Sequence, residues 1–457
     1  MTLNDFFLTL GALLGAGLAI RGFFNPFLGL LVLMSLHFIQ PGEMFPALAP
    51  LRIELVYGVL MLIILLRDKS SEIKDILKND RIVRATLRLL AVVVLTIPFA
   101  IWRGGALGMA VELSKMIMLQ LLMTFFIDSQ DRLRSILWLL VGFMMWFSGS
   151  ALLGYLNGQY YVVNGVQRAE GVNSMAGDPN ELAGVLMAFL PFLVALVSCS
   201  KRFLVRLLLI GCGALTLIVL VLTGARISMV ALLALVIFYI LRSRRKVLNL
   251  IVAAVLAAAG WFLLPAQYQQ RYLTVSHYAG GGKLDDSNAL RLAVWDAGWR
   301  MFLDHPILGV GAGQFATAYG TLYLERKHSA WMQPHNLFLQ LVCELGLVGL
   351  FVFALLAVQI WKAISVVLRM RSSPGLAINY HFAVACNFML IGVALISTVS
   401  HTLYRPYWYL LAGLVAANKA VALRVLDHER GSEAELPHED LERENTFGRL
   451  HPAKRSV

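Results

Sequence analysis

The sequence predicts an all-α polytopic membrane protein with about twelve transmembrane helices. Of its 457 residues, 59% are hydrophobic and only 14% are charged, and the mean hydropathy is +0.72. This composition excludes a soluble globule of that length. The apolar stretches are continuous over about 20 residues, as in membrane helices. They do not alternate with polar residues, as the strands of a membrane β-barrel would.

Thirteen apolar runs are the predicted spans, and since the first two are short, we expect twelve or thirteen helices. They cover residues 6–20, 26–39, 51–66, 89–102, 107–127, 133–155, 181–199, 203–222, 227–241, 247–264, 337–361, 380–399 and 407–422. The runs divide the chain into N-terminal transmembrane helices (1–264), a long polar loop (265–335), C-terminal transmembrane helices (336–423) and a tail (424–457). The tail is charged and poor in apolar residues, which predicts a disordered cytoplasmic segment.

Lysine and arginine gather in alternate connections between the runs, at residues 67–88, 132–134, 201–206, 242–246 and 362–371. Cationic connections stay on the cytoplasmic side, so the remaining connections belong on the opposite side. These are 157–180, 223–226, 265–334 and 401–406. The formal net charge of +12 is therefore a matter of topology, and we expect no nucleic-acid partner. The side of the amino terminus depends on the two short runs and stays open.

Metal and disulfide chemistry find little support in the sequence. All four cysteines lie in or at the ends of apolar runs, which argues against a disulfide framework or a metal knuckle. Asp285 and Asp286 form the one adjacent acidic pair of the outer loops, in a glycine-rich stretch. We expect no metal and no cofactor.

The long loop has an internal pattern. Between residues 288 and 304, apolar residues recur every three or four positions, which predicts an amphipathic helix at the membrane surface. Arg291, Trp295 and Trp299 project from it at i, i+4 and i+8. The two tryptophans fit a membrane-interface belt, with stacking on sugar rings as the alternative. The stretch Leu308-Gly-Val-Gly-Ala-Gly313 then predicts a flexible, sharp turn; no strand precedes it and no Lys-Ser/Thr follows, which argues against nucleotide binding.

His335 ends this loop and, with Asn336, precedes an apolar run. A histidine has an ordinary pKa of about 6.5, which suits a general base near neutral pH. His335 is therefore the candidate base, and the alternative is a helix cap or another structural group. His305 precedes a proline and looks structural, while His328 has no supporting context.

Several strings together resemble the signature of the O-antigen ligase and polymerase superfamily. They are Gly177-Asp-Pro-Asn180-Glu-Leu-Ala183, Thr223-Gly-Ala-Arg226, Arg291-Leu-Ala-Val-Trp295, Asp304-His-Pro-Ile-Leu-Gly-Val-Gly-Ala-Gly-Gln-Phe315, His335-Asn-Leu-Phe-Leu-Gln340 and Glu344-Leu-Gly-Leu-Val-Gly349. The resemblance covers about residues 173–349. It is specific for the superfamily, whose members share these motifs while acting on different acceptors.

The resemblance implies a GT-C-like glycosyltransferase of the bacterial inner membrane, with its active site facing the periplasm. Such an enzyme moves a glycan from undecaprenyl pyrophosphate to an acceptor hydroxyl, and the long outer loop favours O-antigen ligation to lipid A-core in lipopolysaccharide synthesis. The alternatives are an O-antigen or exopolysaccharide polymerase and a protein O-oligosaccharyltransferase. A polysaccharide transporter is a further alternative from another class. The sequence has no detectable inverted repeat, which argues against a transporter.

The chemistry of a pyrophosphate leaving group calls for fixed cations, and arginine pairs bidentately with phosphate oxygens. With the resemblance, Arg226 and Arg291 are the predicted pyrophosphate-binding residues, and Asn180 and Asn336 are supporting residues. Taken alone, Arg226 also fits an anchor at the membrane interface. Arg291 also fits a solvated helix face.

Glu112 and Lys115 lie three residues apart within a predicted span, where a charge costs at least a few kcal/mol. Two interpretations stay open. The two side chains neutralise each other, or Lys115 helps to bind the lipid-linked pyrophosphate.

Overall fold

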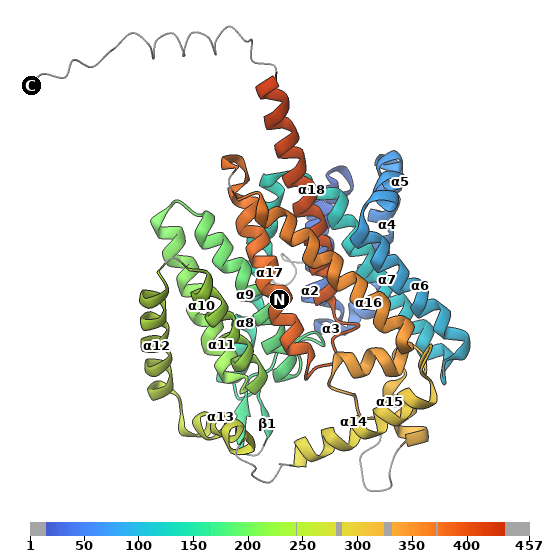
Figure 1. Ribbon diagram of the computed structural model, residues 1–457, viewed down its shortest axis with the longest axis vertical. Coiled ribbons are helices and arrows are strands. Elements are labelled where there is room, and N and C mark those ends of the chain that lie inside the picture. Colours follow the sequence, from blue (N-terminus) through green and yellow to red (C-terminus); the bar gives the residue numbers. More distant parts are fainter. Residues whose placement is uncertain are drawn as a thin grey trace, which may run out of the picture.

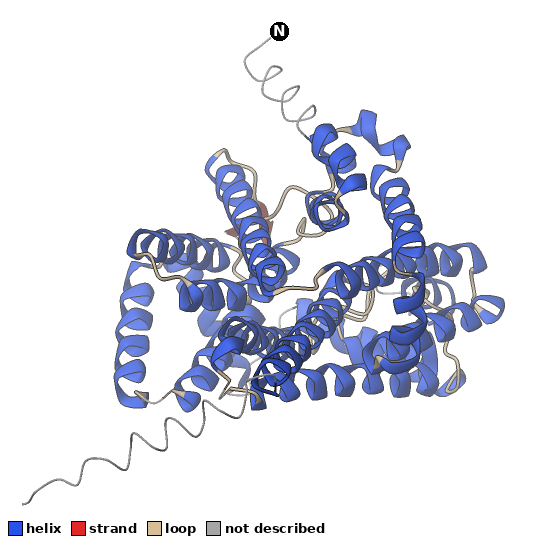
Figure 2. Ribbon diagram, turned by 90° about the horizontal axis from the view of Figure 1, so that it is seen from above, coloured by secondary structure: helices blue, strands red, loops and turns tan. Residues whose placement is uncertain are grey.

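The computed structural model describes residues 15–163, 165–243, 245–279, 286–323, 331–371 and 373–434. Helices make up nearly all of its regular structure (Figure 2), which confirms the all-α class. Within the described ranges, one antiparallel hairpin joins β1 (Tyr161–Val163) to β2 (Val166–Arg168). The sequence did not predict this hairpin, because three-residue strands leave no periodic pattern.

Most long helices follow the predicted spans closely, but the helix at the predicted run 89–102 lies earlier in the chain, at Arg81–Thr96. The long helices are α2 (Pro26–Ile39), α4 (Ile53–Asp68), α6 (Arg81–Thr96), α7 (Arg103–Phe126), α8 (Gln130–Leu156), α9 (Pro179–Cys199), α10 (Phe203–Leu222), α11 (Arg226–Arg242), α12 (Lys246–Leu263), α16 (Leu337–Arg369), α17 (Ala377–Ser397) and α18 (Pro406–Ala434). The shorter elements are α3 (Pro41–Met44), η1 (Pro46–Leu51), α5 (Ser70–Asn79), η2 (Ile97–Phe99), α13 (Ala266–Ala279), α14 (Asp286–Asp304), α15 (Phe315–Ala318), η3 (Tyr319–Tyr323) and η4 (Pro374–Leu376).

The chain is a multi-pass membrane protein. Nine helices of the described residues are long and apolar enough to cross a membrane, and ten if the bent pair formed by α12 and α13 is one span. The predicted total of twelve or thirteen is therefore not confirmed. The predicted run 6–20 lies mostly outside the described residues, and α2 is a shorter apolar helix of 14 residues.

Local sequence sets the helix starts. The Asn25 side chain accepts a hydrogen bond from the backbone N–H of Leu28, and Pro26 begins α2. Asp178 and Pro179 do the same for α9. A short polar side chain followed by proline satisfies exposed N–H groups and presets the first helical turn.

The two ends of the helix bundle differ. Figure 1 shows α13, α14, α15 and the hairpin at one end, hereafter the loop end. It shows α5 and the last turns of α18 at the other end. Between them, α9 and α17 pack closely, with the rings of Phe192 and Phe382 5.6 Å apart. The separation of the loops from the basic segment 67–88, which contains α5, agrees with the alternation predicted from the charges.

Two further predicted boundaries are corrected by the structure. The predicted run 337–361 is not one continuous helix, because Gly346 has non-helical angles (φ 64°, ψ −164°) that break α16. The predicted disordered tail begins too early, since α18 continues to Ala434 and so includes residues 424–434. The rest of that tail lies outside the described residues.

The break in α16 is filled by the glycine-rich turn of the long loop. The backbone N–H groups of Val310 and Leu347 donate to the carbonyl oxygens of Cys343 and Pro306. The glycines of this turn at positions 309, 311 and 313 all have positive φ, which residues with a Cβ atom rarely adopt. The predicted sharp turn is confirmed, but it is held against α16 by hydrogen bonds and is not a flexible link.

Candidate functional site

Arg168, at the end of β2, ties three segments of the loop end together. Its side chain is 4% exposed. Its Nε donates to the carbonyl oxygen of Thr223 at 2.6 Å, and its Nη2 donates to Oδ1 of Asn180 at 2.9 Å. The hairpin, the turn before α11 and the first turn of α9 therefore meet at this guanidinium. Asn180, one of the predicted supporting residues, is oriented by it.

Positive charge collects around Arg168. Arg226 begins α11 directly after this turn, and Nε of Arg271 in α13 donates to the carbonyl oxygen of Gly224 at 2.7 Å. Burial, then the charge of Arg271, lowers the pKa of Arg168 to about 10, and Arg226 acts in the same direction. Arg168 still stays protonated at neutral pH. The guanidinium groups of Arg226 and Arg271 thus lie close enough to influence Arg168, and the three together make a positive region suited to a polyanion.

A pair of histidines lies at the same end. His335 precedes α16 with φ of 45°, and its ring is 5.3 Å from that of His401, which lies in the turn between α17 and α18. Asn336 holds the two segments together. Its Oδ1 accepts from the backbone N–H of Leu339 at 3.1 Å, and its Nδ2 donates to the carbonyl oxygen of Thr398 at 3.0 Å.

The surroundings of His335 keep its imidazole neutral. Burial, followed by the influence of His401 and then of Arg291 in α14, lowers the pKa of His335 to about 4. Trp295 fixes α14 beside it, because the indole Nε1 donates to the carbonyl oxygen of Pro334 at 2.8 Å. At neutral pH the ring therefore has a free lone pair and can accept a proton.

Asp178, the cap of α9, is the shared neighbour of these groups. Its carboxylate accepts from the backbone N–H of Asn180 at 2.7 Å. Its negative charge opposes the lowering of the pKa at His335, at His401 and at Arg168. The side chains gathered around this end of α9 form what we call the arginine–histidine site: Arg168, Asp178, Asn180, Arg226, Arg271, Arg291, His335 and His401.

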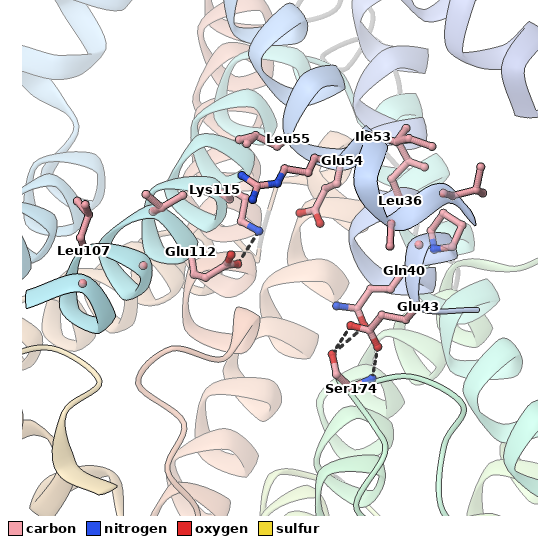
Figure 3. Close-up of a pocket in the computed structure, with 18 residues that line it drawn as sticks. Leu36, Gln40, Glu43, Ile53, Glu54, Leu55, Leu107, Glu112, Lys115 and Ser174 are labelled. Atoms are coloured by element: carbon pink, nitrogen blue, oxygen red, sulfur yellow. Dashed lines mark hydrogen bonds and ion pairs between the residues drawn. The ribbon is translucent and has the colours of Figure 1, made fainter. Parts of the chain in front are cut away.

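The structure places Lys115 elsewhere. Its Nζ lies 2.5 Å from Glu112, as in the interpretation in which the two charges neutralise each other. Both residues line a cavity of about 840 Å³ between α2, α3, η1, α4 and α7, with Ser174 at one corner (Figure 3). We call it the lateral cavity.

Sequence reasoning missed four members of the arginine–histidine site: Arg168, Asp178, Arg271 and His401. Two signals were available: all four lie in connections assigned to the same membrane side as His335, and Asp178 also lies within the string Gly177-Asp-Pro-Asn180-Glu-Leu-Ala183. Neither signal shows which of these residues are in contact with one another. Of the predicted aromatic residues, Trp295 has a structural hydrogen bond, whereas Trp299 is 54% exposed.

The four cysteines are free thiols. Among the described residues, no three His, Cys, Asp or Glu side chains gather in the manner of a metal site. Asp285 and His328 lie outside the described ranges.

Comparison with known proteins adds to this geometry. Residues 211–354 match the family model described as O-antigen ligase. A Rickettsia conorii protein, provisionally named a polysaccharide ligase, is 28% identical over 128 residues, which are 27% of this chain and 29% of that relative. These matches confirm the resemblance to the O-antigen ligase superfamily. The matched segment contains Arg226, Arg291 and His335, whereas Lys115 lies before it.

Proposed function

We propose that this membrane protein, which carries an O-antigen ligase domain at residues 211–354, moves a glycan from undecaprenyl pyrophosphate to an acceptor hydroxyl at the periplasmic face of the bacterial inner membrane. The acceptor is lipid A-core, so that the product is lipopolysaccharide bearing O-antigen. One observation carries the proposal: a neutral imidazole and several guanidinium groups meet around the same end of α9.

The arginines serve the leaving group. Arg226 and Arg291 bind the pyrophosphate oxygens, since a planar guanidinium pairs with phosphate in two parallel hydrogen bonds. Arg168 and Arg271 add positive charge to the same region. As the bond between the anomeric carbon and the phosphate oxygen breaks, negative charge grows on the diphosphate. Cations already in place stabilise that charge without reorganising.

His335 serves the acceptor. It removes the proton of the attacking hydroxyl while the oxygen bonds to the anomeric carbon and undecaprenyl pyrophosphate departs. An imidazole of low pKa is a weak base, but a bound diphosphate brings negative charge close to it and raises its pKa. His335 thus becomes more basic when the donor is present. The reaction so described needs no metal and no cofactor.

The experiment is a deletion of the gene, followed by gels of lipopolysaccharide and of carrier-linked glycan. The proposal predicts bare lipid A-core and long polymer left on the carrier. Single repeats attached to the core would instead assign the chain to the polymerases. An unchanged lipopolysaccharide ladder would refute a role in either step.

A further inference from the structure

The lateral cavity is large enough for a ligand, at about 840 Å³, and lies within the size range of small-molecule sites. The proposed function leaves it unused. Its walls come from the N-terminal helices, before the matched family segment, and Ser174 alone links it to the loop that leads into α9 (Figure 3).

One wall of the cavity faces outward. Leu107 and Val111 of α7 both line it, and they are 55% and 44% exposed. In a membrane-spanning helix, exposed apolar side chains face lipid. Gly108 lies between them on the same wall, and a Cβ atom there would meet nothing within 4 Å. The cavity is therefore open toward the bilayer, and its occupant can keep an apolar chain in the membrane.

The inner side of the cavity is polar. Oε1 of Glu54 lies 2.7 Å from Nδ1 of His37, and Glu54 lies close enough to Lys115 for their charges to interact. Lys115 in turn pairs with Glu112. Figure 3 shows Glu54, Glu112 and Lys115 directed into the same space. Charged groups within a membrane helix bundle are costly, and they mark ligand or ion sites by default.

The balance of charge distinguishes this cavity from the arginine–histidine site. Three carboxylates line it, those of Glu43, Glu54 and Glu112, against the two cations Arg52 and Lys115. Lys115 is already paired with Glu112, so among the described lining residues Arg52 is the cation left for an anion, which suits one phosphate group but not a diphosphate. Carboxylates and the side chain of Gln40 instead suit the hydroxyl groups of sugars, which donate hydrogen bonds.

Arg52 supplies a second feature of the ligand. It has no ion pair or side-chain hydrogen bond among the described residues, and it lies at the cavity just before α4. An unpaired guanidinium suits one anionic group, such as a phosphate on a sugar. An apolar tail, sugar hydroxyls and an anionic substituent together describe an anionic glycolipid.

We propose that the lateral cavity binds the acceptor of the reaction, an anionic glycolipid that enters from the bilayer, while the donor binds at the arginine–histidine site. This inference rests on the proposed function in one respect, because the glycolipid is an acceptor only if the protein transfers a glycan to it. Binding of the glycolipid in the cavity does not depend on that function.

The chain between the two sites is short. Ser174 donates its backbone N–H and its hydroxyl to Glu43, both at 2.6 Å, at the corner of the cavity. Asp178, beside His335, follows four residues later, and four residues reach at most about 14 Å. Arg405 pairs with Glu181 and donates to the carbonyl oxygen of Ser174, which ties this loop down. A glycan held in the cavity thus has its outer sugars near the base.

The test fills the cavity without touching the catalytic side chains. Gly108→Trp places an indole in the open space, and Gly142→Trp is the matched control, because Gly142 is also an exposed helical glycine with nothing within 4 Å. Each purified protein is titrated with lipid A-core glycolipid and, separately, with undecaprenyl pyrophosphate. We expect Gly108→Trp to weaken glycolipid binding at least about tenfold, and undecaprenyl pyrophosphate binding by less than about twofold. The control should match the wild type in both.

A second variant tests the anionic group. Arg52→Ala should weaken binding of the phosphorylated glycolipid and leave binding of the dephosphorylated glycolipid as in the wild type. Equal loss for both glycolipids would overturn the role of Arg52 in binding phosphate.

The outcomes separate the two proposals. If Gly108→Trp loses undecaprenyl pyrophosphate and keeps the glycolipid, the cavity belongs to the donor and the inference is wrong. Unchanged binding of both lipids would also overturn it. A wild-type protein that binds both lipids at separate sites but transfers no glycan would instead refute the proposed function, while the assignment of the cavity would stand.

Discussion

The imidazole rings of His335 and His401 lie 5.3 Å apart with their planes at 76°. One ring precedes α16 and the other lies between α17 and α18, and Nδ1 of His401 is buried with no hydrogen-bond partner among the described residues. Two such rings in one partly buried space disfavour each other's protonation. The pair therefore keeps the proposed base neutral until a substrate anion arrives.

The first prediction concerns pH. Because the pKa of His335 is lowered to about 4, the free enzyme loses its base only when the pH falls well below the ordinary histidine value of 6.5. The acidic limb of kcat/KM reports the free enzyme. We expect this limb near pH 4 in the wild type. His401→Asn removes the neighbour that, after burial, lowers this pKa most, so the limb should move to higher pH. A wild-type limb at 6.5, unmoved by the substitution, would contradict the coupling.

The second prediction concerns the transfer machinery. His335→Ala, Arg226→Ala and Arg291→Ala should each reach the membrane at wild-type levels and lose at least about 100-fold in transfer, because each removes the base or a cation needed as the bond breaks. Lipopolysaccharide ladders in a complemented deletion strain provide the measurement. Arg300→Ala is the control for α14, since Arg300 pairs with Asp296 on the same helix and should keep its ladder. A normal ladder from one of the three variants would remove that residue from the mechanism.

The third prediction concerns the break in α16. Gly346 has φ of 64°, and a Cβ atom there would collide with the carbonyl oxygen of Ile307. Gly346→Ala should therefore lower the free energy of unfolding by at least about 1–2 kcal/mol. At Gly142, which has a helical backbone and open space, alanine should instead stabilise by about 0.5–1 kcal/mol. Thermal unfolding in detergent compares the two, and equal midpoints would argue against a strained turn at Gly346.

The fourth prediction concerns Glu344, which is 1% exposed in the broken helix. Its carboxylate accepts from the backbone N–H groups of Gly313 at 2.9 Å and Phe315 at 3.3 Å. Glu344→Ala leaves both buried donors unsatisfied, at about 1–3 kcal/mol each. Glu344→Gln keeps one acceptor oxygen and should be the milder change. Thermal unfolding midpoints rank the two variants. If Glu344→Ala were as stable as Glu344→Gln, these hydrogen bonds would contribute little to stability.

The fifth prediction concerns metals. Because fixed guanidinium groups neutralise the leaving diphosphate in the proposed mechanism, transfer in purified membranes should continue unchanged in excess chelator. Loss of transfer that magnesium or manganese restores would mean that the arginine mechanism is wrong or incomplete.

Much of the fold could be predicted because each membrane span corresponds to an apolar run in the sequence. The predicted runs 26–39 and 203–222 coincide with α2 and α10 at both ends, and the amphipathic pattern at 288–304 became α14. Whether a segment partitions into lipid depends on the apolar residues of that segment, so a span can be predicted without knowing which helices pack against it. The break at Gly346 could not be predicted, since glycine is also common within continuous membrane helices.

By itself, the sequence determined that the chain crosses a membrane many times, which connections share a side, and which residue types on that side suit pyrophosphate and proton chemistry. Only the tertiary structure decided that Arg168 and Asp178 join His335, and that Lys115 belongs to another cavity. The physical reason is that hydropathy and charge act within a segment. A hydrogen bond between β2 and the start of α9, or a ring contact between two distant turns, depends on how packed helices bring remote segments together.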